Sequence, residues 1–189
     1  MIVVEGAVTE AYDMQPVGSV EVEIAKSVIS NGAFSSGFEV ISTDETNEAG
    51  EFSVEFEPQS VIEYRIRTRK DGFYFKEEFV DREVWLPKEE NVYDIQINQA
   101  STLSVQIDAT SASGRVLFKL DPHSEGCIDC CKTATNYVVN AGSDTMFSCN
   151  VYGNQIIGYQ LFEASSDGDS LTGQIEVKQG ENTFYHKIQ

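Results

Sequence analysis

The 189-residue chain has few positive charges, few prolines and no long apolar run. Its 13 Lys and Arg stand against 31 Asp and Glu, which gives a formal net charge of -18. Such a field repels phosphates and anionic headgroups, so nucleic acid and membrane surfaces are poor candidate partners. Four prolines and 14 glycines exclude a collagenous or low-complexity chain. No apolar run approaches the roughly 20 residues that span a bilayer, so we expect no direct membrane insertion.

The first residues, MIVVEGAVTEAYD, lack the basic and apolar regions of an export signal. Two explanations stay open: either the protein is cytosolic, or a signal has been removed and Met1 is a new start. The abrupt opening on strand-like residues favours the second explanation. In that case the untrimmed chain could also carry a lipid anchor.

Helical periodicity is absent, and short runs of alternating apolar and polar residues take its place. These runs lie at residues 3–8, 19–24, 51–57, 64–69, 93–97, 103–107, 116–120, 136–139, 145–151, 156–162, 173–177 and 183–188. A period of two residues indicates antiparallel sheets with one buried face. The runs recur about every 8–12 residues, which is typical of sandwiches and barrels. The predicted fold class is therefore all-β.

Residues 79–91, FVDREVWLPKEEN, interrupt the alternation. Pro87 and the charged residues after it predict a solvent-exposed connection. We therefore expect two consecutive antiparallel β-sandwich domains, at residues 1–95 and 96–189, the second with a cysteine-rich loop. A single extended sandwich is the alternative, because the connection is short.

Four short motifs follow one another in the first half: Gly6-Ala7-Val8, Pro16-Val17, Gly50-Glu51-Phe52 and Lys70-Asp71-Gly72-Phe73-Tyr74. In this order they resemble a carboxypeptidase regulatory-like domain over about residues 2–95. The resemblance implies a transthyretin-like, Ig-like sandwich of seven strands. It also implies a non-catalytic module of an exported or surface protein, often a bacterial lipoprotein.

Some transthyretin-shaped proteins hydrolyse 5-hydroxyisourate, with histidines, an arginine and a C-terminal Tyr-Arg-Gly-Ser. The first half of this chain has no histidine, and the chain ends Tyr185-His186-Lys187-Ile188-Gln189. We therefore do not expect that activity. The second half resembles no family closely enough to name one.

Cys127, Cys130, Cys131 and Cys149 lie within a short stretch that also holds His123. Together they could form a zinc site, although only one C-x-x-C pair is present. A thioredoxin-type redox pair needs a helix N-terminus, which an all-β chain does not offer. A cysteine nucleophile needs an oriented base, and nothing in the sequence indicates one for His123. We favour disulfides, because an even number of cysteines suits an exported β-sandwich.

The expected pairing of the cysteines starts from a hairpin of residues 136–139 and 145–151. In that hairpin Cys149 lies opposite about Thr135 and on the core face. Neighbouring Cys130 and Cys131 point in different directions, so they take different partners. We expect one bridge from Cys149 to Cys130 or Cys131, and a second from Cys127 to the remaining cysteine. No catalytic residue, cofactor or metal ligand is assigned.

Arg65, Arg67 and Arg69 form a basic stripe in an acidic half-chain. They could clamp an anionic ligand. The better hypothesis is a cross-strand ladder of ion pairs with Glu21 and Glu23, or with Glu51, Glu55 and Glu57.

Three further features have an ordinary and a functional interpretation. Residues 44–48 and 167–170 are acidic loops that could bind calcium, but they lack the spacing of a calcium motif and read as hairpin turns. Trp85 could be a sugar-stacking platform, yet its neighbours favour core packing. His186 is expected to be a solvated strand residue.

These observations predict a non-catalytic binding or scaffold module for a protein or glycan partner. Its location would be extracellular, periplasmic or on the outer-membrane surface, where disulfides persist. A structural subunit of an adhesin or surface appendage is the alternative. A zinc-dependent enzyme is the third hypothesis.

Overall fold

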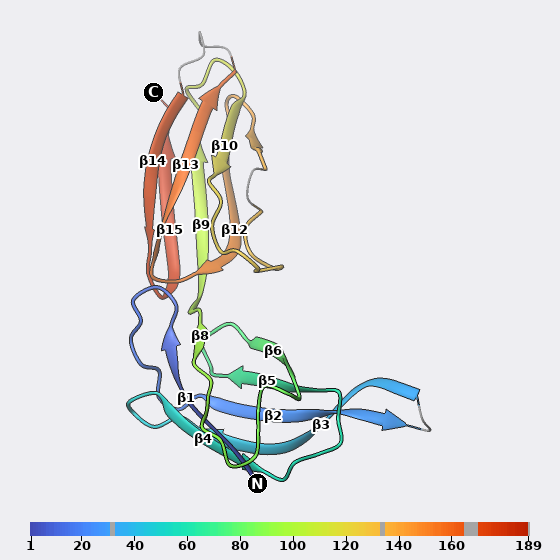
Figure 1. The fold of residues 1–189 in the computed structure, drawn as a ribbon. Coiled ribbons are helices and arrows are strands. Elements are labelled where there is room, and N and C mark those ends of the chain that lie inside the picture. The colour runs from blue at the N-terminus through green and yellow to red at the C-terminus, as the bar shows by residue number, and fades with distance from the viewer. Residues whose placement is uncertain (31–32, 133–134, 165–169, 189) are drawn as a thin grey trace. The chain divides into compact units, whose positions relative to one another are not determined.

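The structure, a computed structural model, describes residues 1–30, 33–132, 135–164 and 170–188. Every regular element in these ranges is a β-strand (Figure 1). None of the described residues lies in a helix that is long and apolar enough to cross a bilayer. The chain divides into two compact units, Met1–Asn98 and Gln99–Gln189, which we call unit 1 and unit 2.

Unit 1 is a sandwich of two β-sheets. Its strands are β1 (Ile2–Glu10), β2 (Glu21–Ser30), β3 (Ala33–Glu45), β4 (Glu51–Phe56), β5 (Glu63–Arg69), β6 (Lys76–Asp81), β7 (Asn91–Val92) and β8 (Ile95–Ile97). One sheet has the strand order β3-β2-β5-β6, and the other has the order β4-β1-β7, with β8 also paired to β1. Because β8 pairs with β1, unit 1 extends a few residues past the boundary expected from the sequence.

The alternation of side chains along each strand builds the core of unit 1. In β4, Phe52, Val54 and Phe56 are buried while the residues between them are exposed. In β5, Tyr64 and Ile66 are buried in the same way. The inward side chains of both sheets form one apolar cluster, and this burial is the main source of stability for the sandwich.

The first strand of unit 1 pairs in parallel with the last two strands, β7 and β8. Between these two strands, the N–H of Tyr93 donates a hydrogen bond of 2.8 Å to the carbonyl oxygen of Glu5. Gly6 permits this close approach, because a Cβ at that position would collide with the Tyr93 carbonyl.

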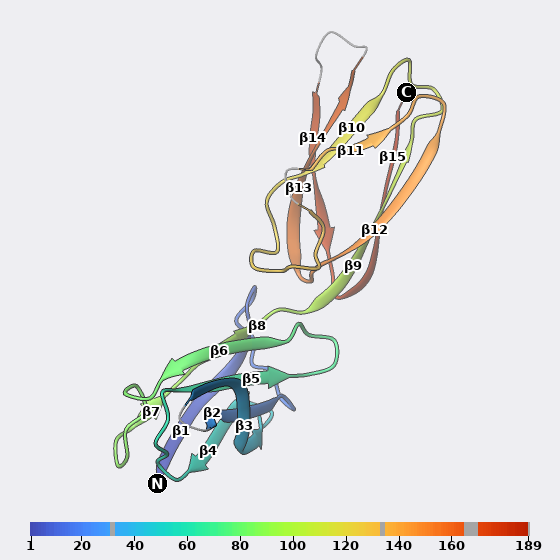
Figure 2. The same ribbon diagram turned by 90° about the vertical axis from the view of Figure 1, so that its right-hand side faces the viewer.

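Unit 2 is a second sandwich. Its strands are β9 (Ala100–Asp108), β10 (Val116–Leu120), β11 (Tyr137–Val139), β12 (Asp144–Tyr152), β13 (Gln155–Glu163), β14 (Ser170–Val177) and β15 (Gly180–Lys187). The two sheets have the strand orders β12-β9-β15 and β11-β10-β13-β14. The central strand β9 runs between its neighbours β12 and β15 (Figures 1 and 2), antiparallel to the first and parallel to the second.

Aromatic rings fill the middle of unit 2. Phe118 is fully buried, and its ring centroid lies 5.9 Å from that of Phe147 and 5.6 Å from that of Tyr159. The ring of Phe184 lies 4.8 Å from that of Tyr159. These rings come from β10, β12, β13 and β15, so they join the two sheets across the core.

The predicted all-β fold with two β-sandwich units is confirmed. Three strands of the described residues, β3, β6 and the two-residue β7, lie outside the predicted runs, and each lies at a sheet edge. β6 contains residues 79–81, which the sequence analysis assigned to an exposed connection, and that assignment is wrong. Only one residue of β6 is buried, and its two apolar residues, Phe79 and Val80, are adjacent, so the strand lacks the alternation of apolar and polar residues that marks the other runs. Pairing of β3 with β2 is interrupted by two register shifts, which disturb its alternation in the same way.

Candidate functional site

The four cysteines lie in unit 2, three of them in the segment between β10 and β11. We call residues 121–132 the cysteine loop. Cys127 is joined to Cys130 and Cys131 to Cys149, with Cα–Cα distances of 5.4 and 5.1 Å. Both distances fall inside the range of about 4.4–6.8 Å that disulfides span. This pairing is one of the two alternatives that the sequence left open.

The cysteine loop runs back along β12. Cys130 pairs with Asn150 in an isolated parallel bridge, and the N–H of Cys131 donates to the carbonyl oxygen of Asn150 at 2.8 Å. Cys131 is only 4% exposed and lies in the apolar cluster of unit 2, with Cys149 packed against it. The Cys131–Cys149 bridge therefore ties the loop to the inner face of β12.

The hairpin that the sequence analysis expected here is wrong. Residues 137–139 form β11, which pairs with β10, whereas β12 pairs with β9 in the other sheet. Cys149 consequently lies opposite Leu103 and not Thr135. The turn at residues 140–143 connects the two sheets of the sandwich, because its flanking strands belong to different layers.

The other end of the loop is held by Ser124, which is buried. Its Oγ accepts hydrogen bonds from the N–H of Tyr152 at 2.9 Å and from Nε2 of Gln155 at 3.0 Å. Ser124 and Gly126 both have a positive φ, of 50° and 80°, so the backbone reverses sharply before the first cysteine. The loop is thus fixed at both ends and projects between them.

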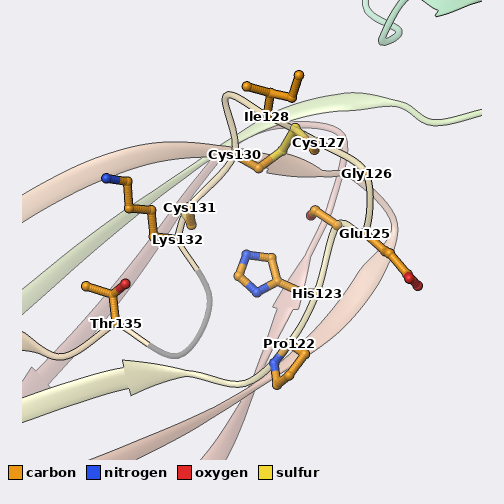
Figure 3. A pocket seen from close by; sticks show the side chains of 11 residues that line it. Pro122, His123, Glu125, Gly126, Cys127, Ile128, Cys130, Cys131, Lys132 and Thr135 are labelled. Atoms are coloured by element: carbon orange, nitrogen blue, oxygen red, sulfur yellow. A yellow bond between two sulfur atoms is a disulfide. The ribbon is translucent and has the colours of Figure 1, made fainter.

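A cavity of about 770 Å³ opens beside this loop (Figure 3). His123 lines it, and its Nδ1 lies 2.8 Å from the carbonyl oxygen of Asp121. If Nδ1 carries the proton, Nε2 is an acceptor, and it is buried with no hydrogen-bond partner among the described residues. Ile128, at the tip of the Cys127–Cys130 ring, is 97% exposed. The cavity thus combines one imidazole with a disulfide wall.

The chemistry of this loop is set by the state of its sulfurs. Sulfurs held in disulfides are not thiolates, so in this state they provide neither zinc ligands nor a nucleophile. Within residues 1–30, 33–132, 135–164 and 170–188, no group of three or more His, Cys, Asp or Glu is placed to hold a metal ion. The loop itself contains no helix that could activate a redox pair.

The arginine stripe of β5 forms the predicted ladder of ion pairs. Arg65 lies 3.0 Å from Glu23, and Arg69 lies 3.4 Å from Glu21, both on β2. Arg67 pairs at 2.6 Å with Glu77 of β6, a partner that the sequence analysis missed together with its strand. Residues 51, 55 and 57, the other predicted partners, lie on or just after β4 of the opposite sheet. Each of the three guanidinium groups is thus paired with a carboxylate of the protein, Arg65 and Arg67 largely buried and Arg69 half exposed.

Aromatic residues that no predicted site includes lie beside this ladder. Phe75, Glu77 and Phe79 follow one another at every second position, which places them on one face of the chain. The guanidinium carbon of Arg67 lies 4.8 Å from the ring centroid of Phe75, and that of Arg65 lies 4.7 Å from the ring of Phe38. The two-residue spacing was the signal that could have revealed this face.

The first acidic loop is a turn, but the predicted hairpin is wrong, because β3 and β4 belong to different sheets and do not pair with each other. Oδ1 of Asn47 accepts the N–H groups of Ala49 and Glu51 at 2.9 and 3.0 Å, and Oγ1 of Thr46 bonds to the carbonyl oxygen of Val17 at 2.8 Å. These bonds close the turn between β3 and β4. The second acidic loop, Asp167-Gly168-Asp169-Ser170, lies outside the described residues except for Ser170.

Trp85 is a core residue, so the alternative of a sugar-stacking platform is wrong. Its side chain is 2% exposed, and its ring lies 5.5 Å from Tyr64 and 5.7 Å from Tyr93. His186 lies on β15 and is half-buried, with its ring parallel to that of Phe184 at 6.3 Å. Neither residue contributes to a site with the cysteine loop.

Two groups with shifted pKa values form a hydrogen-bonded pair in unit 1. The hydroxyl of Tyr93 donates to Oε2 of Glu78 at 2.5 Å. Burial, together with this bond to an anion, raises the pKa of Tyr93 to about 12. Burial opposes ionisation of Glu78, but the bonds from Tyr93 and Lys76 prevail and lower its pKa. Burial also raises the pKa of Glu10, whose carboxylate accepts N–H groups of the following turn. None of these three groups lines the cavity beside the cysteine loop.

No protein-family model and no curated protein matches this chain. The resemblance of residues 2–95 to carboxypeptidase regulatory-like domains therefore stays a prediction.

Several solved structures have a similar arrangement of strands. The TIE protein of Bacillus anthracis matches with 13% identity and a TM-score of 0.40, over 99% of this chain and 33% of that one. The streptococcal ancillary pilin matches with 14% identity and a TM-score of 0.37, over 99% and 62%. The shaft pilin spaA of Lactobacillus rhamnosus GG matches with 12% identity and a TM-score of 0.36, over 99% and 96%. This chain spans about a third of the first relative and less than two thirds of the second. At these identities and scores, the likenesses do not support a function.

Proposed function

We propose that this chain is a non-catalytic structural module of an exported cell-surface protein, and that it transmits tension between its ends. The observation that carries this proposal is the same in both units. In each unit the first strand pairs in parallel with the last strands. A module that transmits tension between its ends is the structural subunit of a surface appendage or adhesin. This role accounts for the parallel strand pairs, whereas a ligand-binding scaffold would not require them.

Unit 2 has the more extensive parallel pairing. β15 pairs with β9 along its whole length, from Gly180 opposite Ser101 to Lys187 opposite Asp108. Tension enters unit 2 at the beginning of β9 and leaves at the end of β15. Because the strands are parallel, these points lie at opposite ends of the pair, so tension slides one strand along the other. All of the hydrogen bonds between them then resist together.

Unit 1 repeats this geometry with a shorter ladder. β1 begins the unit, and β7 and β8 end it, each parallel to β1. The N–H of Tyr93 bonds to Glu5 between the two short strands, and the N–H of Ala11 bonds at 2.9 Å to the carbonyl oxygen of Ile97 beyond them. Tension applied at the ends of unit 1 therefore also acts along these strands and does not peel them apart.

The disulfides fit the same role. They lie outside the β9–β15 pair, so they leave the resistance to tension to the strands. Once the strands separate, the Cys131–Cys149 bridge prevents the residues between the two cysteines from extending. Such bridges persist in oxidising compartments, which supports an extracellular, periplasmic or outer-membrane location. A lipid anchor and a bacterial lipoprotein identity stay predictions.

A pair of proline variants tests this role. The N–H of Ile188 points from the end of β15 to the carbonyl oxygen of Asp108 on β9. Since N–H direction alternates along a strand, the N–H of His186 also points to β9, and that of Tyr185 points away. His186→Pro should lower the force that unfolds unit 2 when the chain is pulled by its ends, and Tyr185→Pro should not.

The measurement is single-molecule force spectroscopy of the whole chain, at one pulling speed for all variants. Equal unfolding forces for the two proline variants and the unmodified protein would show that the β9–β15 pair does not resist tension. Thermal unfolding of each variant provides the control. Both substitutions can lower thermal stability, but only His186→Pro removes a hydrogen bond between β15 and β9.

A further inference from the structure

The outer side of the β3-β2-β5-β6 sheet in unit 1 carries an exposed group of aromatic and charged residues. We call it the aromatic face and define it by Phe38, Phe75 and Phe79 with Arg65, Arg67, Glu23 and Glu77. Phe75 is 52% exposed and Phe79 is 57% exposed, although both are large apolar side chains. This face is independent of the strand pairs proposed to resist tension.

The rings of Phe38 and Phe79 meet above the middle of the sheet. Phe38 lies on β3 and Phe79 on β6, the two edge strands, yet their ring centroids are 5.6 Å apart. Ala25 of β2 lies opposite Arg65 of β5, and its methyl group leaves room for rings to lean inward from both edges. The aromatic face is therefore a continuous surface across four strands.

The two arginines support the rings from one side. The guanidinium carbon of Arg65 lies 4.7 Å from the ring centroid of Phe38, and that of Arg67 lies 4.8 Å from that of Phe75. The side chains of these arginines are only 13% and 20% exposed. Both are also fixed by carboxylates, so the rings are held in place before any ligand arrives.

The charges of the aromatic face cancel, which is unusual in this chain. Arg65 and Arg67 are matched by Glu23 and Glu77, through ion pairs of 3.0 and 2.6 Å. The whole chain, in contrast, carries a formal net charge of -18. A second copy would bring the same negative charge and be repelled, and an anionic ligand would meet the same field. A neutral ligand that offers both apolar and hydroxyl surface fits this face best.

We propose that the aromatic face binds a neutral oligosaccharide. The C–H faces of the sugar rings would lie on Phe75 and Phe79, and hydroxyl groups would donate to Glu77 between them. Every ion pair and hydrogen bond recorded for Glu77 among the described residues uses Oε2, which leaves Oε1 to accept a hydroxyl. Phe75 and Phe79 are four residues apart, or about 13 Å along an extended chain. That distance is more than one sugar ring spans, so the ligand is an oligosaccharide.

The test uses a panel of neutral hexasaccharides, β-1,4-linked chains of glucose, mannose, xylose or galactose, titrated into the full chain by calorimetry. We expect at least one to bind with a Kd below about 1 mM. Phe79→Ala should weaken that binding about tenfold, because one stacked ring is lost. Tyr12→Ala is the matched control, since Tyr12 is an aromatic residue of unit 1 that is 60% exposed and lies outside the aromatic face.

Two outcomes would overturn the proposal. One is that no member of the panel binds, or that Phe79→Ala and Tyr12→Ala weaken binding equally. The other is concentration-dependent self-association in sedimentation that Phe79→Ala abolishes, because the occupant would then be a second copy. Neither outcome bears on the tension-transmitting role, which is tested on other strands.

Discussion

Reduction of the disulfides should lengthen unit 2 when it is unfolded by force. With the Cys131–Cys149 bridge intact, the chain between these residues cannot extend. The two cysteines are 18 residues apart, and each residue spans at most about 3.6 Å when extended, which gives about 65 Å. Their Cα atoms are already 5.1 Å apart, so reduction should release about 60 Å of extra length.

The Cys127–Cys130 bridge hides much less chain. Its cysteines are three residues apart, which corresponds to about 11 Å, and 5.4 Å of this already separates their Cα atoms. Reduction of this bridge therefore adds only about 5 Å. Full reduction should lengthen unit 2 by about 65 Å, and almost all of that gain should persist in a variant that lacks only the Cys131–Cys149 bridge.

The assay is force spectroscopy of the whole chain pulled by its ends, with and without a thiol reductant. Unit 1 contains no cysteine, so its unfolding length is an internal control that reductant must leave unchanged. An unfolding length for unit 2 that does not respond to reductant would refute the reasoning, because the bridges would then be absent. Cys149 is 19 residues from Cys130 and 22 from Cys127, so a gain clearly longer than about 65 Å would indicate a different pairing of the cysteines.

Three further predictions concern unit 1. Trp85→Ala should lower the free energy of unfolding by about 3–5 kcal/mol in chemical denaturation, because a fully buried ring would leave a cavity; a loss below about 1 kcal/mol would contradict core packing. A double-mutant cycle on Arg67 and Glu77 should give a coupling energy of about 1 kcal/mol that shrinks at high salt, and zero coupling would remove the ladder as a source of stability. The raised pKa of Tyr93 means that the folded state holds its proton longer than the unfolded state, so stability should fall as the pH rises from about 10 towards about 12. Tyr93→Phe should remove this part of the pH dependence, as measured by denaturation at several pH values.

The alternation in the sequence predicted which side of each strand faces the core, but not which strand lies beside it. Phe52, Val54 and Phe56 alternate with acidic residues, and they are buried as expected. The alternation could not predict that β1 pairs in parallel with β7 and β8, or that β15 pairs in parallel with β9. Side chains alternate in the same way beside a parallel or an antiparallel neighbour. β6 shows a further limit, because its two apolar residues, Phe79 and Val80, are adjacent and give no alternation of apolar and polar side chains.

The cysteine loop illustrates the same limit. The sequence placed Cys149 on the core face, where it packs. It assigned the wrong neighbouring strand, because the turn before β12 leads from one sheet to the other. The pairing of Cys131 with Cys149 depends on the path of the loop along β12, which is held by the bond from Cys131 to Asn150. The sequence contains no local signal for that path.

The most direct test of the tension-transmitting role compares two directions of pulling on unit 2. In the first, the chain is pulled by its two ends, so that tension slides β15 along β9. In the second, one handle is at Ala141, in the turn before β12, and the other is at the C-terminus. Both handles then lie at the same end of the sheet, because Asp144 at the start of β12 and Lys187 at the end of β15 both pair with Asp108 at the end of β9. Tension in this direction peels the strands apart one hydrogen bond at a time. We predict a clearly higher unfolding force in the first direction than in the second, at the same pulling speed. An equal or lower force between the ends would contradict the proposed function.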